Sequence, residues 1–243
     1  MKAPIVEAAC TVRRLARRPS AVAALVLVGL LLGYATLVNP VATAREALSA
    51  AAAIGATVVL VLSAGIVAED RERGRLALAA THPSPPAVWV VGRWLAVLGA
   101  AAAVFAVALA VLLAVVPARP PVGVALGVAA ALAHLGALAA LAVALSCSLG
   151  STAQLLVLLA VFAIGALPPE LAAQALGRAA GVAAKVAWAV LPTPWVLGRL
   201  NAWLLGAGVP SPWLALALVL QPALWLGAGA RRLGRAELAV RGL

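Results

Sequence analysis

The feature that most constrains this chain is the length of its charge-free apolar runs. Residues 120–169 contain no Lys, Arg, Asp or Glu. About 20 consecutive apolar residues cross the core of a bilayer, so this stretch is long enough for two crossings. Over the whole chain 65% of the residues are hydrophobic and 10% are charged, whereas a soluble domain is about half apolar and a quarter charged. This composition excludes a soluble globular domain and a disordered chain, and it predicts an integral membrane protein.

Charged residues and one polar break divide the chain into six predicted membrane spans. A single charge at the centre of a span costs about 2.5–3.5 kcal/mol, so the spans are expected to lie between charges. The polar break at residues 146–152 separates the fourth span from the fifth. The predicted spans are residues 21–38, 47–68, 94–116, 122–145, about 149–167, and 213–230. We therefore expect an all-α integral membrane protein in which residues 1–243 form a single transmembrane domain with six transmembrane helices.

The segment before the first span, residues 1–19, has an amphipathic pattern. One helical face carries apolar side chains and the rest carries Glu7 and four arginines; the apolar face consists of Ile5, Ala9, Val12 and Ala16. This pattern predicts a cytoplasmic amphipathic helix on the membrane surface, with its arginines near anionic lipid headgroups. The alternative is a basic flank that only sets the topology.

A second amphipathic segment lies between the fifth and sixth spans, within the extracytoplasmic segment 168–212. Gln174, Arg178, Gly181 and Lys185 share one helical face. Two charges inside a membrane span would together cost about 5–7 kcal/mol. We therefore expect an interfacial or re-entrant helix here rather than a seventh span.

The distribution of basic residues predicts the orientation. Thirteen of the 18 Lys and Arg residues fall on one side of the six-span topology and five on the other. The positive-inside rule then places both termini in the cytoplasm. The membrane is expected to be a bacterial-type cytoplasmic membrane. The net charge of +11 is concentrated at the ends of apolar runs, which is not the pattern of a nucleic-acid-binding surface. We expect lipid rather than nucleic acid as the partner of these charges.

The chain shows no pattern of catalytic, metal-binding or cofactor-binding residues. His82 and His134 lie far apart, and Cys10 and Cys147 do not form a C-x-x-C pair. The predicted spans contain no acidic residue of the kind used in ion-coupled transport, and no P-loop is present to bind ATP. For His134, a position packed between helices and bonded to a backbone carbonyl is favoured over a haem or metal ligand. We expect a chain that is not an enzyme and that has no cofactor of its own.

The most informative segment is the predicted cytoplasmic connection between the second and third spans, residues 69–93. A connection of about five residues would be enough for two neighbouring helices, and this one is much longer. It begins with three acidic residues and three arginines, and continues with Leu76 and Leu78 in a short helix-forming stretch that ends before Pro83. A short helix with an apolar face is suited to docking in a groove of another protein. The alternative is a solvated loop that only sets the topology.

This segment resembles the coupling-helix motif of permeases of the type-2 ABC exporter superfamily, approximately E-x-E-x-G-T-L-x-x-L-L-x-x-P. The residues that match it are Asp70, Glu72, Gly74, Leu76 and Pro83. Residues 91–95 are similar to the family's entry into its third span. The chain differs from the motif at Arg75, Ala79 and Ala80. The order of an amphipathic helix, six spans and outer helices also resembles this family.

The resemblance implies a permease subunit of an ATP-driven exporter, with ATP bound and hydrolysed by a separate cytoplasmic ABC ATPase. It also implies a second permease copy, either identical or similar to this chain. The residues expected to dock the ATPase are Asp70, Glu72, Gly74, Leu76, Leu78 and Pro83. Two alternatives stay open: a haem-exporter-like or copper-enzyme-maturation permease of the same class, and a non-transporting membrane scaffold or assembly factor.

Overall fold

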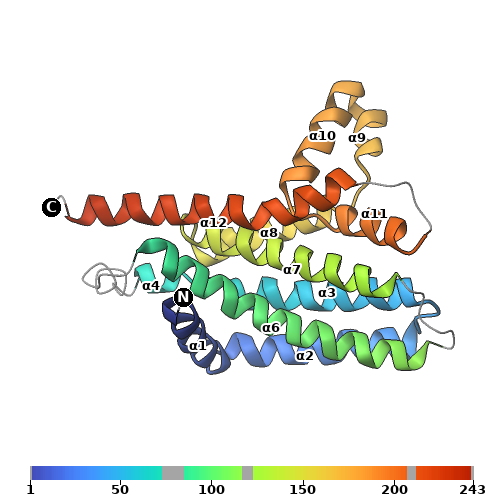
Figure 1. Cartoon of the computed structure of the whole chain (residues 1–243), viewed down its shortest axis with the longest axis horizontal. Coiled ribbons are helices and arrows are strands. Elements are labelled where there is room, and N and C mark those ends of the chain that lie inside the picture. The colour runs from blue at the N-terminus through green and yellow to red at the C-terminus, as the bar shows by residue number, and fades with distance from the viewer. Residues whose placement is uncertain (1, 73–84, 117–122, 207–211, 242–243) are drawn as a thin grey trace.

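The computed structural model describes residues 2–72, 85–116, 123–206 and 212–241, and within these ranges the chain is helical with no β-strand (Figure 1). Five helical stretches are long and apolar enough to cross a membrane. They comprise α2 (Pro19–Gly33) with the π-helical turn η1 (Tyr34–Val38), α3 (Ala44–Ser63) with the residues that follow it to Asp70, α6 (Pro86–Val115), α7 (Val124–Ser146) and α12 (Pro212–Arg241). These elements confirm the prediction of an all-α protein with the composition of an integral membrane protein.

The fifth predicted span corresponds to α8 (Ser151–Ile164), which is shorter than the others. Its 14 residues extend about 21 Å at 1.5 Å per residue, against about 30 Å for the hydrocarbon core of a bilayer. The structure therefore supports five helices of spanning length, and the sixth span stays a prediction.

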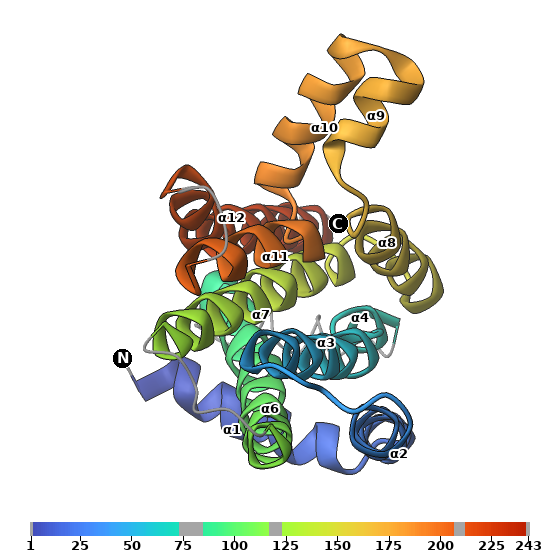
Figure 2. The same cartoon turned by 90° about the vertical axis from the view of Figure 1, so that its right-hand side faces the viewer.

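The core of the bundle lies around α3 and α7. We compare the most apolar 18-residue stretch of each helix. In α3 72% of this stretch is buried and in α7 67%, against 17% in α2 and 22% in α12. Viewed from one end, α3 lies beside α2, α6 and α7, and α12 covers another side of α7 (Figure 2). Small residues allow this close approach: a Cβ on Gly55 would lie 3.0 Å from a methyl of Leu135 and 3.3 Å from Cβ of Phe105.

The predicted N-terminal helix is present as α1 (Lys2–Ala16). Its face with Thr11 and Leu15 is buried, and α1 packs along α6. The apolar face predicted to contact lipid lies about 100° around the helix from the buried face and is left exposed by the protein, with Ile5 63% and Val12 46% exposed. A helix that the bundle holds on one face and that exposes an apolar face beside it is compatible with a membrane surface, which stays a prediction.

The stretch expected to form one helix between the last two spans forms two, α9 (Pro169–Leu176) and α10 (Arg178–Val190). Gly177 separates them at φ +90, a backbone conformation that favours glycine and interrupts an α-helix. The two helices pack against each other and extend sideways from the bundle (Figure 1). A further helix, α11 (Pro194–Leu204), returns to pack on α7 before α12 begins.

Two boundaries near the predicted coupling segment differ from expectation. The second span is not one helix: α3 ends at Ser63, and a short helix α4 (Ala68–Glu72) follows after a turn. The third begins at Pro86 rather than at residue 94, because Pro85 and Pro86 provide the extended backbone and the fixed φ that start a helix. The expected segment 69–93 therefore contains α4 except for its first residue, and the first two turns of α6.

Candidate functional site

The break after α3 is held by side chains from two other parts of the chain. Gly65 adopts φ +67, and its N–H donates to Oε1 of Gln154 over 3.1 Å. The side-chain amide of Gln154 donates in turn to the carbonyl oxygens of Ser63 and Ala142 over 3.0 and 2.9 Å. Buried backbone outside a helix needs such partners, because no water is available to replace the lost helical bonds.

A second side chain caps the start of α4. The backbone N–H groups of Val67 and Ala68 donate to the hydroxyl of Ser146, over 2.8 and 3.3 Å. Val67 and Ala68 are each 1% exposed, so this hydroxyl serves donors that solvent does not reach. Together with Gln154, Ser146 fixes the direction in which α4 leaves α3.

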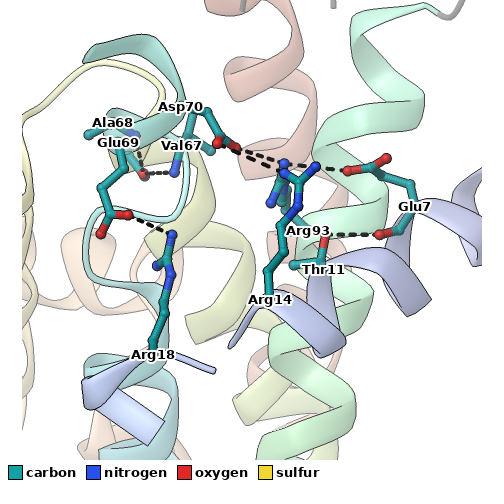
Figure 3. Close-up of polar contacts among 10 residues, drawn as sticks. Glu7, Thr11, Arg14, Arg18, Val67, Ala68, Glu69, Asp70 and Arg93 are labelled. Atoms are coloured by element: carbon teal, nitrogen blue, oxygen red, sulfur yellow. Dashed lines mark hydrogen bonds and ion pairs between the residues drawn. The ribbon is translucent and has the colours of Figure 1, made fainter. Parts of the chain in front are cut away.

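The direction of α4 brings an acidic side chain against α6. Asp70 and Arg93 form an ion pair with 2.7 Å between Oδ2 and Nη2, and their side chains are 4% and 2% exposed (Figure 3). The guanidinium also lies 4.5 Å from the centre of the Trp89 ring, one turn earlier on α6. Burying a charge is costly unless it is paired and hydrogen-bonded, so this contact links α4 firmly to α6.

Helix α1 completes the arrangement from the other side. Glu7 lies 3.4 Å from Nη2 of Arg93, Arg14 lies 3.9 Å from Asp70, and Arg18 pairs with Glu69 at 2.9 Å (Figure 3). Helix α1 approaches closely at Gly92, where a Cβ would lie 2.6 Å from Cγ of Glu7. We call this set the charged junction; its members are Glu7, Arg14, Arg18, Glu69, Asp70 and Arg93.

The charged junction lies at the two ends of the connection 73–84. Asp70 is two residues before the last residue of α4, and Arg93 is in the second turn of α6. Because these two side chains bind each other, the helices on both sides of the connection are joined directly and not only through the chain between them. The ion pairs of the charged junction thus join α4, α6 and α1.

The structure describes only part of the predicted docking set. Asp70 is present, but its carboxylate is buried and faces Arg93. Glu72 ends α4, and its side chain lies outside the described part of the chain, as do Gly74, Leu76, Leu78 and Pro83. Docking of an ATPase by these residues therefore stays a prediction, whereas a role of Asp70 in holding α4 against α6 is visible.

Sequence reasoning missed the partners of Asp70. It treated Arg93 as a charge flanking the third span and Glu7 as part of the polar face of α1. One signal was available: the chain has 7 acidic residues against 18 Lys and Arg, so each acid near a span is a candidate partner for a buried base. The pairing itself depends on the positions of α1, α4 and α6, which the sequence pattern does not give.

The expected hydrogen bond between His134 and a backbone carbonyl is not formed through Nδ1 of its ring. The side chain is 1% exposed in α7, and its Nδ1 has no hydrogen-bond partner among the described residues. The described residues also contain no group of three or more His, Cys, Asp or Glu that could hold a metal ion. His134 is therefore buried, and its Nδ1 does not form the expected hydrogen bond with a backbone carbonyl.

Comparison with the models of known protein families gives no match, and no curated protein matches the chain. Function must therefore be inferred from the arrangement of the residues themselves. The charged junction contains neither a nucleophile beside a general base nor a set of metal ligands. What it offers is a set of ion pairs that join α1, α4 and α6 on either side of residues 73–84.

Proposed function

We propose that this chain is the membrane-spanning permease subunit of an ATP-driven exporter of the type-2 ABC superfamily, working with a separate cytoplasmic ATPase. One observation carries the proposal: the buried Asp70–Arg93 pair joins the helices on both sides of the connection 73–84. The resemblance of residues 70–83 to the coupling-helix motif of these permeases supports it independently. In this proposal the six spans include α8, and both termini lie in the cytoplasm.

A coupling element needs two properties, a surface for the partner and a stiff link to the membrane helices. The surface is assigned here to Leu76 and Leu78, which the sequence places on the connection. The stiff link is the charged junction, because separating one partner of a buried ion pair costs about 3–5 kcal/mol. Closure of the ATPase would then move α3, α6 and α1 as one unit instead of bending a free loop.

The proposal requires a second permease copy and contact with lipid. The most apolar stretches of α2 and α12 are only 17% and 22% buried, so these two long apolar helices present most of their surface outward. In a bilayer such surfaces face lipid or another apolar chain. The proposal assigns these surfaces to lipid and to the second permease copy that the resemblance implies.

The experiment is a double substitution in the connection, Leu76→Asp with Leu78→Asp. Placing two charges in an apolar docking contact should lower affinity for the ATPase about a hundredfold or more, equivalent to about 2.7 kcal/mol. The measurement is the amount of P-loop ATPase that copurifies with the chain from detergent-solubilised membranes at matched expression. The matched control is Leu76→Met with Leu78→Met, which keeps the contact apolar and should keep the partner.

Two results would contradict the proposal. If the native chain copurifies with no P-loop ATPase, the chain is not a subunit of such an exporter, and a scaffold or assembly factor becomes the better interpretation. If the double Asp variant keeps full ATPase binding and transport, the connection is an ordinary loop. The purified chain alone should show no ATP hydrolysis, and robust hydrolysis by it would also overturn the assignment.

A further inference from the structure

Helices α8 and α11 lie one after the other along α7. In the first turn of α8, the amide of Gln154 donates to the carbonyl oxygen of Ala142, near the end of α7, over 2.9 Å. At the last residue of α11, the carbonyl oxygen of Leu204 lies against the position that a Cβ on Gly123 would take, and Gly123 directly precedes α7. Together the two helices therefore extend over almost the whole length of α7, in the opposite direction.

The two helices meet about halfway along α7. Phe162, near the end of α8, and Pro194, the first residue of α11, line one cavity with His134, which is near the middle of the 23 residues of α7. The N–H of Trp195 donates to the carbonyl oxygen of Gly165 over 3.0 Å. This bond joins the start of α11 directly to the end of α8, although 29 residues separate the two helices.

The direction of the neighbouring helices requires a crossing at this place. A Cβ on Gly229, in the second half of α12, would lie 3.2 Å from Cα of Ala144, near the end of α7. Leu214, near the start of α12, belongs to the same apolar cluster as Leu200 of α11. Thus α7 and α12 run in the same direction, and both are long enough to cross a membrane. The chain between them has to return across the bilayer.

Neither α8 nor α11 is long enough for this return alone. The 14 residues of α8 extend about 21 Å and the 11 residues of α11 about 17 Å, whereas the hydrocarbon core is about 30 Å thick. Their sum of about 38 Å is sufficient, even for tilted helices. Arg199 is the only charged residue in the two helices, and it lies five residues before the end of α11, where a long side chain reaches the headgroups.

The hairpin of α9 and α10 leaves the bundle from the junction of α8 and α11. At its base, Nε1 of Trp188 donates to the carbonyl oxygen of Leu167 over 3.1 Å, and Nε1 of Trp225 donates to that of Val190 over 3.2 Å. Trp225 lies within the apolar, membrane-spanning part of α12. The base of the hairpin is therefore held at the depth of the bilayer, and the hairpin extends sideways from it (Figure 1).

Helix α10 exposes an apolar face along this hairpin. Val182, Val186 and Val190 follow one another by one helical turn and are 58%, 60% and 40% exposed. Gly181 and Ala184, on the opposite side of α10, are buried. Helix α9 packs on α10 and lies nearer to the end of the bundle at which α11 ends, so the apolar face of α10 points toward the middle of the bilayer (Figure 1). At that depth the surrounding medium is the acyl chains of lipid.

We propose that α8 and α11 together form one crossing of the membrane, and that the hairpin of α9 and α10 branches from it inside the bilayer with its apolar face against lipid acyl chains. The proposal does not depend on the exporter assignment, because it requires no ATPase. A second copy of the chain is the alternative occupant of the apolar face, and the experiment distinguishes it from lipid.

The experiment measures the depth of single residues in proteoliposomes of the full chain. Single cysteines are introduced in a background of Cys10→Ser and Cys147→Ala and labelled with the fluorophore bimane. Lipids that carry a nitroxide near the glycerol quench shallow labels, and lipids that carry it near the end of the acyl chain quench deep labels. Leu30→Cys is the reference for the bilayer centre, because Leu30 is 65% exposed near the middle of the 20 residues Pro19–Val38.

Ile164→Cys tests the composite crossing, since Ile164 is the last residue of α8 and is 56% exposed. We expect a label there to be as deep as one at Leu30. If α8 crossed alone, Ile164 would lie at the surface, about 15 Å from the centre, which is half the thickness of the core.

The contact of the hairpin with lipid is tested at two neighbouring residues. A bimane label on Val186→Cys should be quenched by the acyl-chain nitroxides. Lys185 is also exposed but lies outside the apolar face. Lys185→Cys should react about tenfold faster with a membrane-impermeant maleimide than Val186→Cys does, because the reactive thiolate is disfavoured among acyl chains.

Three results would contradict the proposal. A label at Ile164 near the headgroups would show that α8 crosses alone. If Val186→Cys is not quenched and reacts as fast as Lys185→Cys, the hairpin lies in water. If Val186→Cys is neither quenched nor reactive, a second copy of the chain covers the apolar face instead of lipid.

Discussion

The buried ion pair of the charged junction can be tested by removing one charge at a time. Asp70→Asn keeps the shape of the side chain but leaves Arg93 with Glu7 at 3.4 Å as its nearest described anionic partner. Removing one partner of a buried pair costs about 3–5 kcal/mol, and the remaining Glu7 places this variant near the lower end of that range, at about 3 kcal/mol. Arg93→Met leaves Asp70 in a site where its side chain is 4% exposed, and should cost about as much.

The double variant measures the interaction between Asp70 and Arg93 apart from the cost of changing each side chain alone. With Asp70→Asn and Arg93→Met together, no full charge of this pair is left buried, so the loss should be smaller than the sum of the two single losses. We expect a coupling energy of about 2–3 kcal/mol between them, in the range measured for residues in direct contact. The free energy of unfolding is measured by titration with sodium dodecyl sulfate in mixed micelles, followed by far-ultraviolet circular dichroism.

A matched control exists within the same junction. Arg18 and Glu69 pair at 2.9 Å, nearly the same distance, but their side chains are 20% and 34% exposed. This pair is part-buried, so solvent screens it more than the Asp70–Arg93 pair, and Glu69→Gln should lower stability less than Asp70→Asn does, by about 1 kcal/mol. If Asp70→Asn costs no more than Glu69→Gln, burial does not strengthen the junction. If the two losses at Asp70 and Arg93 simply add, the pair does not act as described.

Two further predictions concern the bundle. Gln154→Leu removes the partners of the Gly65 N–H and of two buried carbonyl oxygens, so it should lower the free energy of unfolding by about 3 kcal/mol or more in the same titration; a loss below about 0.5 kcal/mol would show that the break after α3 does not need this side chain. In a Cys10→Ser background, Lys185→Cys should react with a membrane-impermeant maleimide added outside cells and Arg235→Cys should not; labelling of both from one side would contradict the six-span topology.

The sequence alone determined the class of the fold and the positions of most long helices. Charge-free runs correctly located the five apolar helices of spanning length, because a charge in a bilayer core is costly enough to mark the end of a span. The face pattern of residues 5–16 correctly predicted a helix at the N-terminus. Proline and glycine decided the boundaries that were missed, at Pro86 and at Gly177, where local backbone geometry counts more than hydropathy.

Only the tertiary structure decided which residues meet. Gln154 reaches Gly65 across 89 positions of the chain, and Arg93 reaches both Asp70 and Glu7 from a third helix. Hydropathy could not give these contacts, because an almost uniformly apolar helix such as α7 carries no polar face to show which side turns inward. The same reason hid the surroundings of His134: the sequence gives its position along α7, but its neighbours are set by the packing of α3, α8 and α11 around it.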